Sequence, residues 1–483
     1  MTSTSRRAFL FAGGAGLVAA AYRPSRWLAL SSEAPAGSFL VPTSKDIDVA
    51  AHLLNRCTLG TRPGDREALL TLGPVAWVDE QLHPERLDDR ETEHALRRFP
   101  ELLEPTAELY EYKPRVLLRD FVRATILRAV VSRRQLQQVM VEFWTDHFNI
   151  DIGKGDCAWL KVADDREVIR VHALGRFSTL LRASALSPAM LWYLDGRANR
   201  RSTPDDRPNE NYARELLELH TLGVHGGYTQ QDVMEVARCL TGWTVRPRSG
   251  FGKARVEFHR HEHDDGPKRV LGRAISAGGG ERDLDDVLEL VASHPATARH
   301  LATKLCRRFV ADEPPEPVVS AVALSFTSSA GDIRETLRTL FNHPAFFESR
   351  GTKLKRPFHF LVSALRATGA VTEVPPALAD FLTSMGQAPF QYPTPDGYPL
   401  EAAPWQATLV WRWKLAGALA GNRVPDTRID VSGLARRAGG ESGLMAHVLG
   451  RRPTGAEEEA WRELGGGPAG LAILLASPGF QRC

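Results

Sequence analysis

The sequence predicts a mainly α-helical protein, a large multi-helix body with one small inserted β-hairpin. Apolar residues recur at spacings of three and four through most of the chain, which is the period of an amphipathic helix. Strand-like alternation is confined to one stretch, and prolines and glycines fall between the periodic segments. With 483 residues, the chain is also long enough to bury a large core.

Each periodic segment is expected to form a helix whose apolar face packs inward. Pro208 precedes one such helix, Gly223 follows it, and Pro295 opens another. Thr229 is expected to cap the helix that it precedes. The predicted helices are 116–150, 208–222, 229–242, 284–311, 316–343, 352–369 and 404–420.

The strand signal runs from Val256 to Leu271, where apolar residues flank a turn-like Asp264-Asp265-Gly266-Pro267. This pattern predicts a β-hairpin inserted near 254–273. A second irregular stretch, Pro389 to Pro404, carries five prolines and two tyrosines and cannot be helical throughout. It is expected to cross the surface or line a cleft.

The first residues predict export. Arg6-Arg7 precede Phe9-Leu10 and an apolar run, and Ala34-Pro35-Ala36 offers a cleavage site. Paired arginines before Phe-Leu resemble the twin-arginine signal, which addresses folded cargo. The alternative is an ordinary signal for unfolded export. Residues 1–36 are therefore expected to be a twin-arginine-type signal peptide and 45–483 a helical domain, periplasmic or extracellular, with no membrane span in the mature chain.

Charge and cysteine content exclude several classes. The 61 basic and 58 acidic residues nearly balance, which argues against a dedicated nucleic-acid binder. The five cysteines are far apart and never form Cys-x-x-Cys, which argues against a disulfide framework and a zinc–cysteine site, although one disulfide stays open. Cys239 and Cys306 lie in apolar helical patterns and are expected to be buried thiols.

Two predicted helices carry histidine beside their apolar face. In the first, His147 shares a stripe with Phe143 and Ile150, while a polar set lies opposite: Glu142, Asp146 and Asn149. In the second, His220 lies beside Leu216 and Leu219. Both histidines are candidate metal ligands. The alternative is that each is a hydrogen-bonded core residue.

The helix at 208–222 also has a polar face with Asn211, Glu215 and Glu218, and Arg214 stands between them in sequence. Glu215 or Glu218 is a candidate general base, with a pKa that burial would raise or Arg214 would lower. Asn211 and Arg214 complete the candidate catalytic set. The alternative is a solvated ladder in which Glu210, Arg214 and Glu218 pair along the helix surface.

In the predicted hairpin, His259, His261 and His263 alternate. On a strand, all three would project from one face. With Glu262 and Asp264 adjacent, they could bind a divalent metal such as zinc. The alternative is a polar edge with ordinary exposed histidines. The chain has no serine-hydrolase elbow, phosphate-binding loop, dinucleotide fingerprint or covalent-haem motif, so any further cofactor would be bound non-covalently.

Several long strings resemble the domain-of-unknown-function 1800 family over about 45–483. The most specific is NENYARELLELHTLG from Asn209, followed by FHRHEHDDGPKRVLG from Phe258. The resemblance implies a largely helical bacterial protein, often with a twin-arginine leader. It also implies a partner, a co-exported protein of a sulfatase- or phosphatase-like family. The family often has His-Asn-His after Phe-Trp, whereas here Thr145-Asp146-His147 follows, so a ligand at the first position is in doubt.

Two functions follow as hypotheses. The first is an exported metal-dependent enzyme, with hydrolysis of an extracellular or envelope polymer as the reaction considered. Its divalent metal would be held by His147, His220, His263 and Asp264, and Glu215 or Glu218 would act as the base. The second is a non-enzymatic envelope protein that binds or assembles with a co-exported partner, in which the polar helix faces are structural networks.

Overall fold

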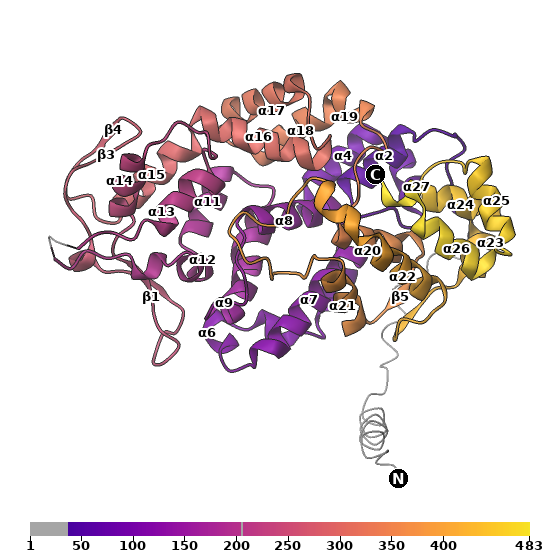
Figure 1. Cartoon of the computed structure of the whole chain (residues 1–483), viewed down its shortest axis with the longest axis horizontal. Coiled ribbons are helices and arrows are strands. Elements are labelled where there is room, and N and C mark those ends of the chain that lie inside the picture. The colour runs from indigo at the N-terminus through magenta and orange to yellow at the C-terminus, as the bar shows by residue number, and fades with distance from the viewer. Residues whose placement is uncertain (1–36, 204–205) are drawn as a thin grey trace, which may run out of the picture.

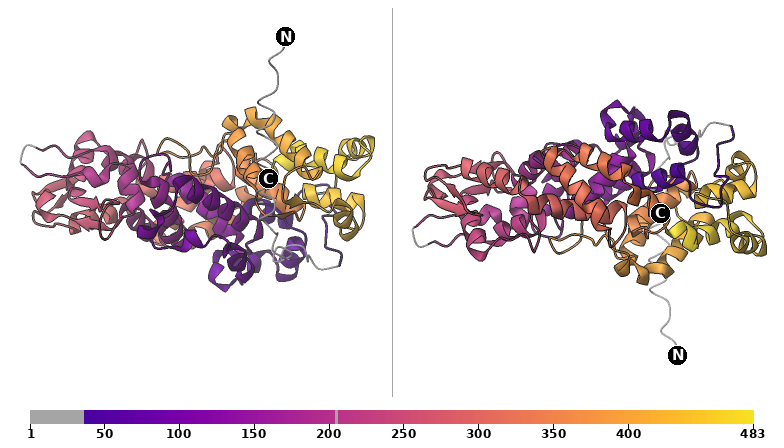
Figure 2. Two further views of the ribbon diagram at one scale, coloured as in Figure 1. Left: turned by 90° about the horizontal axis from the view of Figure 1, so that it is seen from below. Right: turned by 90° about the horizontal axis from the view of Figure 1, so that it is seen from above.

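The computed structural model describes residues 37–483, except for 204 and 205, so the predicted leader at 1–36 lies outside the described residues. The prediction of a mainly α-helical body is confirmed, with three small two-stranded sheets among the described residues where one β-hairpin was expected. Figure 1 shows an elongated molecule, with β3 and β4 at one end, α23 to α26 at the other, and α8 near the middle. The two views in Figure 2 keep these groups at opposite ends. In the part described, no helix is both long enough and apolar enough to span a bilayer.

The first half of the chain contains helices that the sequence pattern predicted and several that it did not. Those at 49–109 and 157–193 lie outside the predicted set. The elements are α2 (Val49–Cys57), α3 (Asp65–Leu72), α4 (Pro74–Leu82), η2 (Pro84–Arg86), α5 (Arg90–Leu96), η3 (Pro100–Leu103), α6 (Thr106–Leu109), α7 (Pro114–Val131), α8 (Gln135–His147), α9 (Cys157–Ala163), η4 (Asp164–Ile169), α10 (Arg170–His172), α11 (Phe177–Ala185), α12 (Pro188–Tyr193), η5 (Gly196–Ala198), α13 (Asn211–Glu215), η6 (Leu216–His220) and α14 (Gln230–Cys239).

Short strands and a second series of helices follow. The strands are β1 (Trp243–Val245), β2 (Val256–Phe258), β3 (Lys268–Val270), β4 (Arg273–Ile275), β5 (Val371–Thr372) and β6 (Thr427–Arg428), with η7 (Arg260–Glu262) after β2. The helices are α15 (Arg282–Ala292), α16 (Pro295–Phe309), α17 (Glu316–Ser328), α18 (Ile333–Asn342), α19 (Pro344–Glu348), α20 (Pro357–Ala367), α21 (Pro376–Ser384), η8 (Ala403–Thr408), α22 (Leu409–Ala420), α23 (Val431–Arg437), α24 (Glu441–Leu449), α25 (Gly455–Glu463), α26 (Gly467–Ala476) and α27 (Pro478–Gln481).

Two helices predicted as continuous are pairs, and a third periodic segment divides at the proline that was predicted to open its second helix. The segment 116–150 is α7 and α8, which are separated where Ser132 takes an extended backbone. Segment 284–311 breaks at Pro295, and 316–343 breaks where Ala330 and Gly331 take φ of +54° and +75°. The apolar period continues across each break because both helices of a pair face the same core. Thr229 caps α14 as predicted, in a reciprocal capping box with Asp232.

The predicted hairpin at 254–273 is instead two hairpins. β2 pairs with β1, placing Phe258 opposite Trp243, and β3 pairs with β4. The rings of Trp243 and Phe258 lie 5.1 Å apart, and such cross-strand aromatic pairs favour the pairing that is seen. The backbone N–H of Leu271 donates to Asp232 of α14. The Asp232 carboxylate on α14 therefore accepts a hydrogen bond from the backbone next to β3.

In the described part of the chain, two helices contain a π-helical segment, η4 and η6, which carry Asp165 and His220. Such widened turns are rare and recur at functional sites. All five cysteines are buried free thiols. Burial raises the pKa of Cys239 and of Cys306 to about 12, as expected for apolar surroundings.

The proline-rich segment 386–403, here called the strap, lies across the end of α8. The Nδ2 atom of Asn149 donates to the carbonyls of Tyr392 and Thr394 at 2.9 and 2.8 Å. In Figure 1 the strap is the orange trace beside α8. Pro389, Phe390 and Tyr398 line a pocket against α8, so the prediction that this stretch lines a cleft is confirmed.

Gly397 fixes the approach of the strap to α8. Its φ is +73°, and a Cβ atom there would overlap the carbonyl oxygen of Asp146. We expect Gly397→Ala to lower the free energy of unfolding by about 3–5 kcal/mol, combining left-handed strain with overlap. Gly386→Ala is the matched control. Its φ of +81° imposes similar strain, but its nearest neighbour, Trp405, lies 4.0 Å away. Equal losses for both variants in denaturant melts would contradict this account.

Candidate functional site

His147 ends α8 and points into the core, as the helical pattern predicted. It is 1% exposed. Its ring lies among aromatic side chains, with Phe148 at 4.6 Å and Trp144 at 5.3 Å between ring centroids. Figure 1 places α8 near the centre of the molecule, so this end of the helix is surrounded by packed elements.

His147 and the nearby His300 make hydrogen bonds to carbonyl groups at the end of another helix, η6. The last carbonyls of a helix lack partners within it. Here the carbonyl of His220 lies 3.1 Å from Nε2 of His147, and the carbonyl of Leu219 lies 3.2 Å from Nε2 of His300. The Nδ1 atom of His147 accepts from Nζ of Lys304 at 2.9 Å. Both ring nitrogens of His147 are therefore engaged with protein atoms.

Burial controls ionisation in this cluster. It lowers the pKa of His147 well below its usual range, that of His220 to about 3 and that of His300 to about 4, and the charge of Lys304 acts in the same direction. Burial also lowers the pKa of Lys304 to about 8. At neutral pH the three imidazoles are neutral. Nε2 of His220 is buried and has no hydrogen-bond partner among the described residues.

His263 and Asp264 belong to a different network. Nδ1 of His263 lies 2.9 Å from the carbonyl of Thr241, and Nε2 lies 3.2 Å from a carboxylate oxygen of Asp283. Asp264 accepts two hydrogen bonds from Arg238, at 2.8 and 3.1 Å. Burial alone would raise the pKa of Asp264, but its hydrogen bonds from Arg238 and from the backbone hold it below its usual range.

The structure brings His147 and His220 together and keeps His263 and Asp264 apart from them. The ring centroids of His147 and His220 are 6.1 Å apart. Among the described residues, the ligand atoms of His147, His220 and His263 do not all lie within 4.8 Å of one another, which a shared metal would require. The two pairs therefore form two separate polar networks.

The candidate catalytic residues Asn211, Arg214 and Glu218 each contact a different partner. Asn211 donates to the carbonyl of Leu194 at 3.1 Å. Arg214 pairs with Glu210 at 2.9 Å, which forms half of the predicted ladder. Glu218 does not continue it and instead accepts from the Tyr228 hydroxyl at 3.1 Å.

Glu215 is half-buried on the same helix, beside Glu218. Burial raises its pKa, Glu218 adds to the effect, and Arg214 opposes it. Of the two shifts considered from the sequence, the raised one is found. A carboxyl group with a raised pKa retains its proton closer to neutral pH, which is the property that a general acid needs.

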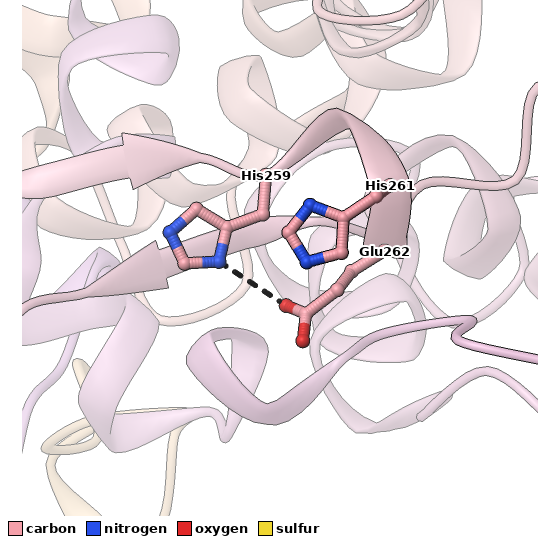
Figure 3. A group of neighbouring side chains, drawn as sticks. All are labelled: His259, His261 and Glu262. Carbon is pink, nitrogen blue, oxygen red and sulfur yellow. Dashed lines mark hydrogen bonds and ion pairs between the residues drawn. The ribbon is translucent and has the colours of Figure 1, made fainter.

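A compact group of possible ligands lies next to β2. The strand ends at Phe258, and the tight turn η7 follows, so the three histidines do not share a strand face. His263 turns inward and is buried. His259, His261 and Glu262 converge, as Figure 3 shows. Their ligand atoms all lie within 4.8 Å of one another. Nδ1 of His259 is 3.3 Å from Oε2 of Glu262, and the two imidazole rings lie 5.7 Å apart.

A charged cluster that the sequence pattern did not identify as a site lies against the other face of α8. Arg356 joins Asp146 at 2.6 Å and Glu142 at 2.7 Å, and both acids line the pocket beneath the strap. The helical pattern had separated Glu142 and Asp146 from the apolar stripe. Nothing in the sequence indicated that an arginine 210 residues away in the chain pairs with Asp146.

A comparison with known families gives one match over most of the chain. The profile of the family described as "Protein of unknown function (DUF1800)" matches residues 52–482. The chain belongs to this family. No curated protein and no solved structure matches it. The resemblance expected from the NENYARELLELHTLG string is thereby confirmed over nearly all of the described residues, and the family description carries no activity.

The buried neutral histidines predict acid sensitivity. Burial lowers the pKa of His52 and His220 to about 3 and of His300 and His447 to about 4. In the unfolded chain each binds a proton near pH 6.5. Below that pH the unfolded state holds more protons, so stability falls as the pH drops toward 4. The loss is about 1.4 kcal/mol per pH unit for each histidine.

Denaturant unfolding at about pH 7.5 and about pH 5 measures this loss. We expect His447→Gln to reduce the pH dependence and His225→Gln, at an exposed histidine, to leave it unchanged. Equal stability of the wild-type protein at both pH values would contradict the assignment of neutral buried imidazoles.

Proposed function

We propose that this protein is an exported metal-dependent enzyme that hydrolyses an extracellular or envelope polymer, with its divalent metal bound by His259, His261 and Glu262. The observation that carries the proposal is the convergence of these three side chains in a partly exposed turn. Export rests on the arginine pair in the leader, which lies outside the described residues.

The number and type of ligands favour a catalytic site over a structural one. Structural zinc sites are closed by four protein ligands, whereas catalytic sites use three and leave one position open. Two imidazoles and one carboxylate are a set that catalytic zinc sites use. His261 is exposed, and His259 and Glu262 are partly exposed, so a substrate could reach the open position.

Neighbouring charges supply the remaining parts of a hydrolytic site. Oε2 of Glu257 lies 3.9 Å from Nε2 of His259. A 2.7 Å ion pair with Arg246 holds the Glu257 carboxylate in place, and this carboxylate is the group that we assign as acceptor of a proton from water. A bound divalent ion would supply Lewis acidity. Arg200, 3.8 Å from Glu262, is a second cation available for a developing negative charge.

Zinc binding tests the proposal directly. We expect the wild-type protein to retain about one zinc per chain after gel filtration, and His261→Ala and Glu262→Gln to weaken binding at least about tenfold. His225→Ala, at an exposed histidine outside the cluster, is the control. Metal content is measured by mass spectrometry. Absence of zinc in the wild type would rule out the site.

The same series tests the other candidate set. Loss of zinc in His147→Ala or His263→Ala, with His261→Ala unaffected, would move the metal to the set that the helical pattern suggested. Hydrolysis of nitrophenyl esters, phosphates and glycosides is then measured with zinc present. Activity that Glu257→Gln removes without loss of zinc supports the role of Glu257 as base.

A second candidate function is assembly with a co-exported protein, for which we propose the exposed start of α22 as the contact. Val410 and Trp413 are 55% and 54% exposed, and Leu409 and Trp411 are each 38% exposed. Apolar side chains grouped in this way on a surface mark interaction sites. The sulfatase- or phosphatase-like protein suggested by the family resemblance is the partner to test.

We expect the two purified proteins to form a complex by size-exclusion chromatography with light scattering. Trp411→Ser with Trp413→Ser should weaken it at least about tenfold, because exposed tryptophans dominate such contacts. Leu324→Ser, at a leucine that is 70% exposed on α17, is the control. A complex that both variants form equally well would exclude this face.

A further inference from the structure

The hairpin of β1 and β2 leads directly to the proposed metal site, because His259 follows the last residue of β2. Side chains of a strand point alternately to its two faces, and partners across an antiparallel pair share a face. Trp243 lies opposite Phe258 and is buried, so this face meets the core. Thr244 and its partner Glu257 occupy the outer face. The backbone of His259 is extended, so His259 continues that outer face.

Arginine side chains surround Glu257 on this outer face. Nε of Arg246 lies 2.7 Å from a carboxylate oxygen of Glu257, and the other oxygen is 3.9 Å from Nε2 of His259. The hydrogen bond from Arg246 lowers the pKa of Glu257 most, and the charges of Arg255 and His259 lower it further. All three groups therefore lie close to this one carboxylate, and two of them are arginines next to a proposed metal ligand.

A second basic segment, 197–203, borders the proposed metal site from another side. The backbone N–H of Arg201 donates to the carbonyl of Glu262 at 2.8 Å, which holds the segment against η7. The side chain of Arg200 is 66% exposed, and its Nη1 atom lies 3.8 Å from Oε1 of Glu262. Cations from two separate parts of the chain thus stand beside the same three ligands.

These two segments carry a local excess of positive charge. Residues 197–203 and 243–263 contain eight arginines and lysines but two acidic residues, whereas the whole chain has 61 and 58. Arg248 and Arg255 are exposed and form no ion pair with a described residue. The cations of these segments that do pair with an acid at close range are Arg201, Arg246, Lys253 and Arg260.

Exposed arginines without a carboxylate partner favour an anionic ligand. A guanidinium group binds phosphate, sulfate or carboxylate through two parallel hydrogen bonds. Arg248 lies in the loop after β1, Arg255 just before β2, and Arg200 beside Glu262. A ligand with a single charged group would use the cations nearest the metal alone. A polymer with repeated acidic groups can contact all three, and its approach is favoured by the local charge.

The loop between β1 and β2 also bears on the choice between a polymer and a lipid surface. It projects from the body in Figure 1, and its Phe251 is 97% exposed. A basic loop with an aromatic residue at its tip is compatible with an anionic membrane. A lipid surface would meet the tip, however, and the cation beside Glu262 would then have no role. The position of Arg200 favours the polymer.

We propose that the polymer that reaches the metal site is anionic, and that Arg248, Arg255 and Arg200 bind its acidic groups along the hairpin of β1 and β2. The inference rests on the proposed function, because it names the class of polymer on which the metal site acts. Phosphate, sulfate and carboxylate groups share this recognition chemistry.

Fluorescence anisotropy with labelled polymers tests the inference, on the wild-type protein with and without zinc. The probes are dextran sulfate, polyphosphate and poly-L-glutamate, with neutral dextran as the uncharged counterpart. We expect at least one polyanion to bind at least about tenfold more tightly than dextran, and Arg248→Gln with Arg255→Gln to weaken that binding at least about tenfold. Added salt should weaken it too, because exposed charges are screened.

The matched control is Arg428→Gln with Arg436→Gln, two exposed arginines in or next to α23, at the opposite end of the molecule in Figure 1. Equal weakening by both double variants would overturn the site, and so would dextran binding as tight as that of every polyanion. Tighter binding to vesicles of phosphatidylglycerol and phosphatidylcholine than to every polyanion would overturn it in favour of a membrane surface.

Zinc content, measured on the same samples, separates this inference from the proposed function. Polyanion binding that the Arg248 and Arg255 variant loses while it retains its zinc supports the anionic class of substrate. A wild-type protein that holds zinc and binds no polyanion would contradict this inference alone. A wild-type protein that binds a polyanion through these arginines and holds no zinc would contradict the metal site and leave the polymer-binding surface supported.

Discussion

The buried guanidinium of Arg356 is the interaction on which the centre of the molecule depends. It contacts two carboxylates one turn apart on α8, Glu142 and Asp146, and it lies at the start of α20. Burial disfavours its charge, but Glu142 and then Asp146 outweigh that effect and raise its pKa. Removing either partner of a buried pair costs about 3–5 kcal/mol, because a charge is left uncompensated. This electrostatic cluster therefore ties α20 to α8 beside the pocket.

His147 and His261 show how similar residues take different roles according to their surroundings. His147 is enclosed, its two nitrogens are engaged, and its main effect is to complete the end of a neighbouring helix. His261 is exposed in a tight turn and has neighbours of the kind that hold a metal. On the opposite face of α8, the acids line an opening. Exposure and free lone pairs, more than residue type, separate a structural histidine from a ligand.

Sequence periodicity predicted which side of a helix is buried, and it predicted little about what lies on the other side. The inward direction of His147 and the cap at Thr229 follow from local pattern and were predicted. The pairing of β2 with β1 was not, because it depends on the contact of Trp243 with Phe258 across a loop. The convergence of His259 and His261 depends in turn on the tight turn that follows that strand.

The parts of the site that could not be predicted are mainly those that depend on contacts between residues far apart in sequence. Asp146 and Arg356 lie 210 residues apart, and the strap meets Asn149 from more than 240 residues away. An amphipathic pattern carries no information about such partners, because any helix with an acidic face gives the same signal. The buried Oδ1 atom of Asp165 has no hydrogen-bond partner among the described residues, which is likewise a property of the folded chain and not of the sequence pattern.

The first described segment packs on the last helices. The N–H of Phe39 donates to the carbonyl of Arg437 at 3.1 Å, and its ring lies 4.9 Å from that of His447. Lys353 and Cys483 also exchange backbone hydrogen bonds. A ribosome that adds roughly 5–20 residues per second needs about 20–80 seconds between making Phe39 and making its partners. The native body is thus completed only after His447 has been made, long after Phe39, and any cellular factor that requires the finished fold has to act after that point.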